Sequence, residues 1–203
     1  IHAGIYYPRD SLKARLCVQG KEKLYAYCRD HHVGHARCGK VIVATAADEE
    51  SVLEDIVAKA TANGVDDVVH WSAAQVQAAE PHVRAVAALF SPSTGIVSSH
   101  ELMQAYLSDM ERDGGAFIGH TRVLEVHREG ELFLLVCDVG GESYRFTTRI
   151  LVNAAGLGAQ AVAGKCSFLD PACIPALYLC KGNYFTLQGR SPFKHLIYPV
   201  PEK

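Results

Sequence analysis

The segment at residues 150–158 passes abruptly from branched apolar residues to residues with almost no side chain. Residues 150–152 have the pattern of a buried strand, and the Asn-Ala-Ala-Gly run at 153–156 then opens a stretch that a helix could continue. Small residues at such a turn let a ligand approach the backbone, and the free N–H groups at a helix start attract anions. The turn therefore has two explanations: tight backbone packing, or contact with the phosphate or ribose of a dinucleotide.

Polar and aromatic residues near both ends of the chain could contact a substrate. His2 could act as a general acid–base group or polarise a substrate carboxylate, because imidazole changes its charge near neutral pH. Lys181, beside a glycine in a segment that we expect to form a strand, could bind a carboxylate in a shielded pocket. The alternatives are simple packing for His2, Tyr6, Tyr7 and Tyr198, and a solvent-exposed strand end for Lys181.

A cluster of histidines precedes Cys38. The spacing of His31 and His35 would let both bind a metal ion from one helix. Gly34 interrupts that helix and no second cluster supplies further ligands, so we predict a solvated helix end and no metal site.

The elements that must position these side chains follow from the spacing of apolar residues. Apolar residues recur every three or four positions in the expected helices and gather in short β-rich runs in the expected strands. We predict strands at 40–46, 67–72 and 86–90, and helices over 12–28 with a cap at Asp10 or Ser11, over 48–64, from Ser72 to Pro81, and from Ser98 or Ser99 to Gly114.

From Thr121 onward the apolar period changes to two. Glu-Gly and Gly-Gly pairs separate the runs, which predicts an antiparallel meander of three or four strands over residues 121–150. We expect its last strand to run into Asn153 and to join a sheet with the strand at 40–46 or the strand at 86–90. Two further strand-like runs lie within residues 173–201.

The composition bounds the class of protein. A chain of 203 residues with 49% hydrophobic residues can bury a core, and a formal net charge of −2 gives no electrostatic argument for binding nucleic acid. Seven widely spaced cysteines without a Cys-x-x-Cys pair predict reduced thiols and a cytoplasmic location. No apolar run reaches the roughly 20 residues that cross a bilayer. We expect a fragment, because the chain starts at Ile1 rather than Met and stops just after a Tyr-Pro-Val-Pro run.

Several motifs, in order along the chain, resemble one known family. They are "IHAGIYYPRDSLKARLCVQG", "CGKVIVAT", "TGIVSSHEL", "ILVNAAG", "LCKGNYFTL" and "LIYPVPEK". Together they resemble the D-amino-acid-oxidase-like (DAO) superfamily of FAD-dependent oxidoreductases and, within it, the L-2-hydroxyglutarate dehydrogenase/oxidase branch. The resemblance covers essentially the whole chain.

The resemblance implies an α/β (mixed α+β) fold. In it an FAD/NAD(P)-binding domain of the glutathione-reductase type is interleaved with an antiparallel-sheet substrate domain, and the fold is incomplete, because the family's Gly-x-Gly-x-x-Gly turn is absent from this sequence. Residues 1–40 and 112–165 would belong to the FAD-binding domain, and residues 41–111 and 166–203 to the substrate domain.

The resemblance also implies the residues that contact FAD and substrate. In the family, the opening His-Ala-Gly segment lies close to the flavin, a strand backbone contacts the adenine end, and the Asn-Ala-Ala-Gly turn contacts the phosphate and ribose. The implied cofactor-binding residues are His2, Ala3, Gly4, Val123, Asn153, Ala154, Ala155 and Gly156, and the candidate catalytic residues are His2, Tyr6 and Lys181.

The implied activity is oxidation of a small L-2-hydroxy acid resembling L-2-hydroxyglutarate to the 2-oxo acid, by hydride transfer to flavin. The electron acceptor stays unknown. Two alternatives stay open: an amine or amino-acid oxidase of the same superfamily, which would oxidise C–N instead of C–O, and a catalytically silent fragment that acts as a binding module.

Overall fold

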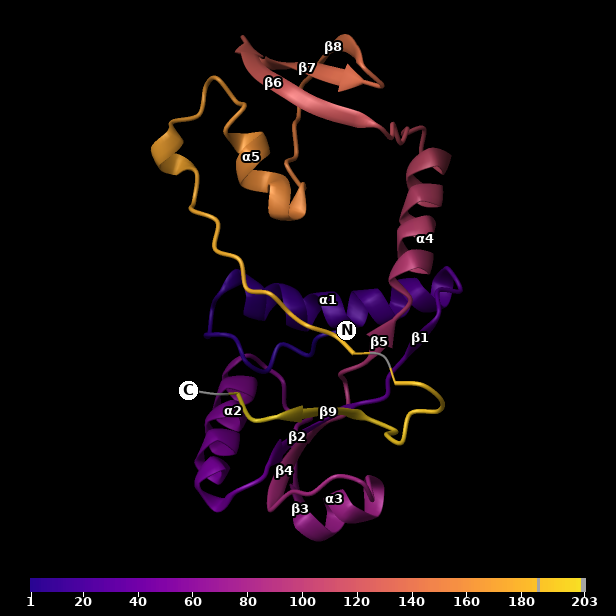
Figure 1. Cartoon of the computed structure of the whole chain (residues 1–203), viewed down its shortest axis with the longest axis vertical. Helices are drawn as coiled ribbons and strands as arrows, with labels where there is room; N and C mark the ends of the chain where they lie inside the picture. The colour runs from indigo at the N-terminus through magenta and orange to yellow at the C-terminus, as the bar shows by residue number, and fades with distance from the viewer. Residues whose placement is uncertain (186, 202–203) are drawn as a thin grey trace. The chain divides into compact units, whose positions relative to one another are not determined.

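The computed structural model describes residues 1–185 and 187–201. By their internal contacts these residues form two units: Ile1–Gly114 together with the residues described after position 186, and Gly115–Phe185. Helices and sheets occur in both units, so the predicted mixed α/β fold is confirmed (Figure 1). The assignment of segments to a cofactor domain and a substrate domain stays a prediction.

A four-stranded sheet forms the centre of the first unit. Its order is β3 (Val69–Ser72), β4 (Ala87–Ser91), β2 (Lys40–Ala44) and β9 (Leu196–Pro199). β2 pairs antiparallel with β4 and parallel with β9, which comes from the far end of the chain and lies alongside β2 in Figure 1. All five residues of β2 are buried, because apolar side chains cover both faces of the sheet.

Four helices accompany this sheet: α1 (Leu12–Asp30), α2 (Glu50–Ala62), α3 (Ala73–Ala79) and α4 (Ser99–Arg112). The short helix η1 (Ala47–Glu49) precedes α2, and β1 (His35–Ala36) pairs with β5 (Ile96–Val97). Ser11, Ser72 and Ser98 cap α1, α3 and α4 by accepting a hydrogen bond from the backbone N–H three residues on. The predicted helices and their starts are therefore confirmed.

The second unit contains the predicted meander. Its strands are β6 (Thr121–Glu129), β7 (Leu132–Val139) and β8 (Glu142–Thr148), joined by two-residue turns. In the second turn, Gly140 and Gly141 both have positive φ, which a tight hairpin favours and glycine adopts without strain. The helix α5 (Ala159–Ala163) and the short helices η2 (Gly156–Gly158) and η3 (Pro171–Cys173) follow.

Three strand predictions are wrong. The meander forms a sheet of its own and joins neither β2 nor β4. β8 ends at Thr148, and Ile150 and Val152 are 77% exposed because no strand in the described part of the chain pairs with them. Of the two runs expected within 173–201, the described residues form only β9, and Lys181 lies in an exposed, irregular segment. An apolar pattern marks a segment that can form a strand, but a strand also requires a hydrogen-bonding neighbour.

Among the described residues, no helix combines the length and the apolar character that crossing a bilayer requires.

Candidate functional site

The opening segment is fixed firmly within the first unit. Ile1 exchanges two backbone hydrogen bonds with Gly95, at 2.6 and 3.1 Å. The side-chain amide of Asn63 donates to the carbonyl oxygens of Gly4 and Tyr7, at 3.1 and 2.9 Å. These bonds hold the backbone of the segment at both of its ends.

His2 is held in one tautomer by its neighbour. The backbone N–H of Gly4 donates to His2 Nδ1 at 2.9 Å, so the neutral imidazole carries its hydrogen on Nε2. The ring stacks on Tyr7, with centroids 5.0 Å apart, and meets Tyr6 edge-on at 5.9 Å. Burial, and then the positive charge of Lys40, lower the pKa of His2. Of the two roles predicted for His2, this geometry favours hydrogen-bond donation from Nε2 over proton abstraction.

Lys40, the first residue of β2, was not identified from the sequence. Its side chain is buried, and its Nζ lies 4.3 Å from the ring centroid of Tyr6 and 5.3 Å from that of Tyr198. Burial lowers the pKa of Lys40 to about 8. The available signal was a lysine placed directly before an apolar run, but its burial depends on β4 and β9, which are distant in sequence.

His2, Tyr6, Lys40 and Tyr198 line a cavity of about 430 Å³. Among the described residues that complete its wall, none carries a carboxylate; they are Ile1, Thr94, Gly95, Ile96, Val97 and Leu196. Burial, and then the neighbouring Tyr198, raise the pKa of Tyr6 to about 12, so its hydroxyl stays protonated at neutral pH. The cavity thus offers positive charge and hydrogen-bond donors, which suits an anionic ligand.

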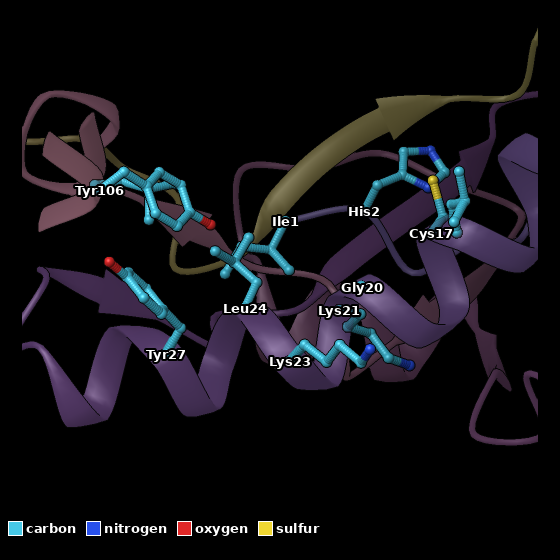
Figure 2. Close-up of a pocket in the computed structure, with 11 residues that line it drawn as sticks. Ile1, His2, Cys17, Gly20, Lys21, Lys23, Leu24, Tyr27 and Tyr106 are labelled. Atoms are coloured by element: carbon cyan, nitrogen blue, oxygen red, sulfur yellow. The ribbon is translucent and has the colours of Figure 1, made fainter. Parts of the chain in front are cut away.

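His2 also borders a second cavity, of about 490 Å³, which extends along α1 to α4. Figure 2 shows the His2 ring at one end of this cavity and the rings of Tyr27 and Tyr106, whose centroids are 4.7 Å apart, at the other. His2 is therefore the side chain with an acid–base group that both cavities share.

The other residues of the opening segment are less accessible. Ala3 and Gly4 are buried within the first unit, so His2 is the one of these three residues whose side chain reaches a cavity. The structure brings His2, Ala3, Gly4 and Tyr6 together, as their sequence proximity requires. Their contacts with a flavin stay a prediction.

The turn at 153–156 is open on its outer side. Asn153 donates from Nδ2 to the carbonyl oxygen of Ala159 at 2.7 Å and accepts from the N–H of Ala155 at 3.3 Å, so its side chain holds the turn. Gly156 has φ +55°, and a Cβ placed on it would meet no atom of the described residues within 4 Å. Packing within this unit therefore does not explain Gly156, whereas its positive φ favours a glycine. An open backbone of this kind fits the approach of a phosphate or ribose of FAD.

Val123 and Lys181 both lie in the second unit. Val123 is half-buried in β6, beside a shift of strand register between Val123 and Glu125, and it packs against the small core of the meander. Lys181 is exposed. Neither residue belongs to the unit that contains His2 and Tyr6, and their roles stay predictions.

Of the histidines expected at a solvated helix end, His31 directly follows α1, whereas His35 lies in β1. His31 stacks on Tyr27, with ring centroids 3.9 Å apart, and its Nε2 lies 3.0 Å from Asp109 of α4. In the part of the chain that the structure describes, no three metal-ligating side chains come together.

Comparison with known proteins gives one consistent family. Residues 1–203 match the family model described as "FAD dependent oxidoreductase" (DAO). Over its whole length the chain is 34% identical to the mitochondrial L-2-hydroxyglutarate dehydrogenase of Arabidopsis thaliana and 32% identical to the L-2-hydroxyglutarate dehydrogenase of Salmonella houtenae. It covers 48% and 47% of those two proteins, and thus spans about half the length of the relatives it matches.

A solved structure that aligns with nearly the whole chain shows a similar fold. The FAD-bound L-α-glycerophosphate oxidase of Mycoplasma pneumoniae aligns with 98% of this chain and 53% of its own, with a TM-score of 0.78 and 19% sequence identity. At this level of sequence identity, the similarity between the two structures shows a shared fold and nothing more.

Proposed function

The chain belongs to the DAO family of FAD-dependent oxidoreductases, and on that premise we propose that the whole enzyme oxidises a small L-2-hydroxy dicarboxylate, such as L-2-hydroxyglutarate, to the 2-oxo acid. FAD is the cofactor of this family, and the predicted resemblance is confirmed. The observation that carries the proposal is the cavity that combines Lys40 with a neutral His2 and contains no carboxylate among its described wall residues.

The side chains of the cavity suggest how the substrate is held. FAD, when bound, would supply the acceptor for the hydride that leaves C2 of the substrate, and the proton of the 2-hydroxyl group would be released to water as the 2-oxo group forms. His2 donates from Nε2 to a carboxylate oxygen beside the reacting carbon and so orients that carbon. The raised pKa of Tyr6 keeps its hydroxyl protonated, so Tyr6 does not serve as a base. Its ring makes a cation–π contact with the Lys40 ammonium. The open backbone at 153–156 is the part of the second unit that fits the phosphate or ribose of FAD.

Two features of the proposal concern the cell rather than the site. The electron acceptor that reoxidises the flavin is not identified. All seven thiols are free in the structure, and we propose a cytoplasmic location from the cysteine content alone, whereas the name of the Arabidopsis thaliana relative assigns that protein to mitochondria.

Anaerobic stopped-flow spectroscopy of the whole enzyme tests the function. L-2-hydroxyglutarate should bleach the flavin absorbance and yield one 2-oxoglutarate per flavin, and the D-enantiomer and L-glutamate should leave the flavin oxidised. Bleaching by L-glutamate alone would identify an amino-acid oxidase, and a preparation without flavin absorbance would support a silent binding module. Either outcome contradicts the proposal.

A further inference from the structure

Among the described residues of the first unit, three charged side chains are buried, and they differ in their partners. Lys21 donates to Ser93 Oγ at 2.9 Å. Glu80 Oε1 accepts hydrogen bonds from two backbone N–H groups and from a histidine ring. Lys40 is 4% exposed, and no hydrogen bond or ion pair of its ammonium occurs in the part of the chain that the structure describes. Because an unpaired buried cation is costly, the surroundings of Lys40 suit an anion.

The neighbours of Lys40 leave its ammonium available to a ligand. Tyr6 and Tyr198 present their rings to Nζ, and such cation–π contacts stabilise an ammonium without neutralising it. Lys40 lines the 430 Å³ cavity together with His2, so a ligand in the cavity can reach both groups.

Tyr6 fixes the relation between these two groups. Its ring contacts the His2 ring edge-on at 5.9 Å and the Lys40 ammonium at 4.3 Å. His2 and Lys40 therefore both contact the Tyr6 ring, and both line the same cavity. A dicarboxylate whose two acidic groups are separated by a chain of three carbons has one acidic group for each of them.

We propose that Lys40 binds the distal carboxylate of the substrate, the one remote from the carbon that is oxidised, while His2 holds the reacting end. This inference rests on the proposed function, and it gives Lys40 the role that the sequence had suggested for Lys181. The ammonium selects dicarboxylates over monocarboxylates, because a monocarboxylate would leave Lys40 buried without a partner.

Binding of two unreactive ligands to the oxidised whole enzyme tests the proposal. Glutarate has both carboxylates, and butyrate lacks the distal one; calorimetry measures the Kd of each. Lys40→Met should weaken glutarate binding about 10- to 100-fold, the scale of a lost hydrogen bond to a charged group, and should change butyrate binding less than about threefold. Lys40→Arg should retain part of the preference for glutarate, because it keeps the charge.

Lys21→Met is the matched control, since Lys21 is also a buried lysine of the first unit but already has a protein partner. Its preference for glutarate over butyrate should equal that of the wild type. If Lys40→Met binds glutarate like the wild type, or loses both ligands equally, the proposal is overturned.

A second measurement needs no variant. At pH 8.5, calorimetry of the wild type in buffers of different ionisation enthalpy should detect proton uptake on glutarate binding, because a bound anion raises the pKa of Lys40 from about 8. The other titratable side chains that line the cavity are His2 and Tyr6 from the opening segment and Tyr198 from β9. Equal proton exchange with glutarate and butyrate would contradict the proposal.

The outcomes also separate this proposal from the function on which it rests. A wild-type enzyme that L-2-hydroxyglutarate bleaches, but whose preference for glutarate survives Lys40→Met, refutes the role of Lys40 alone. A wild-type enzyme that neither binds glutarate nor is bleached refutes both.

Discussion

The opening segment and the segment after the meander carry similar sequence signals but have opposite surroundings. Ile5 is fully buried, and the backbone bonds between Ile1 and Gly95 and the bond from Gly4 N–H to His2 Nδ1 fix the chain around His2. Ile150 and Val152, in an equally apolar run, are 77% exposed. The first segment packs against α2 and the sheet, whereas the second has no partner strand among the described residues. Apolar content is the same in both cases, so the partner element decides whether a side chain is held in place.

Removing a buried partner should give the largest effect. Glu80 is fully buried, and its Oε1 accepts from Lys194 N, His195 N and His195 Nδ1 at 2.7 to 2.8 Å. Burial alone would raise the pKa of Glu80, but these hydrogen bonds lower it. Glu80→Ala should destabilise the whole enzyme by about 3–5 kcal/mol in denaturant unfolding, because three donors lose their acceptor.

For comparison with Glu80→Ala in the first unit, we choose Tyr184→Ala in an exposed segment of the second unit. Tyr184 is 96% exposed, so its loss should change stability by less than about 0.5 kcal/mol. A comparable loss from both variants would mean that the second unit is held as firmly as the first, and would break the comparison.

The pH dependence of stability gives a further test of how burial in the first unit affects a charged side chain. Burial lowers the pKa of Lys40 from 10.5 to about 8 in the folded protein. Between these values the unfolded chain binds more protons than the folded chain, so the contribution of Lys40 to stability rises with pH. Below pH 8 the charged lysine destabilises the folded state by up to roughly 3 kcal/mol, at 1.36 kcal/mol per pKa unit.

Without ligand, Lys40→Met should therefore be more stable than the wild type at pH 7, and the difference should shrink as the pH rises to 9.5. Thermal unfolding at each pH checks this, with Lys21→Met as the control. A difference that is independent of pH would show that folding does not lower the pKa of Lys40.

Substitution of His2 should act on the reaction rather than on stability. In His2→Asn the side-chain oxygen can still accept from Gly4 N–H, but the donor at the Nε2 position is lost. Flavin reduction by L-2-hydroxyglutarate should slow by about 10²-fold, the scale of a lost positioned group. His2→Gln, which restores a donor near that position, should recover part of the rate. If the melting temperatures of the two variants differ from that of the wild type, His2 has a structural role instead.

The sequence predicts local elements of this molecule well and distant contacts poorly. The caps at Ser11, Ser72 and Ser98 and the glycine turns of the meander depend on neighbouring residues, and the structure confirms them. The resemblance identified the opening segment as the candidate site, and the structure places His2 and Tyr6 at one cavity. Lys40 was missed, because its burial is produced by β4 and β9, which begin 47 and 156 positions later in the chain.

Substitution of Ala155 in the exposed turn tests whether the openness of the turn serves a cofactor. Ala155 is exposed, so Ala155→Val should change the melting temperature of the apoprotein little. If FAD lies over this turn, the added methyl groups must collide with it and weaken FAD retention about 10-fold, an effect of about 1.4 kcal/mol. Ala161→Val, at an exposed alanine of α5, is the matched control and should leave FAD retention unchanged.

Flavin retained after gel filtration and apoprotein melting, measured on the same three proteins, distinguish the two explanations of the turn. Loss of FAD from Ala155→Val alone assigns the small residues to the cofactor. A fall in melting temperature with normal FAD retention assigns them to packing that the whole protein supplies, and the turn would then resemble the opening segment in being held by a partner. In that case the two segments would differ in burial only within the residues that the structure describes, and both would be packed against partner elements in the whole enzyme.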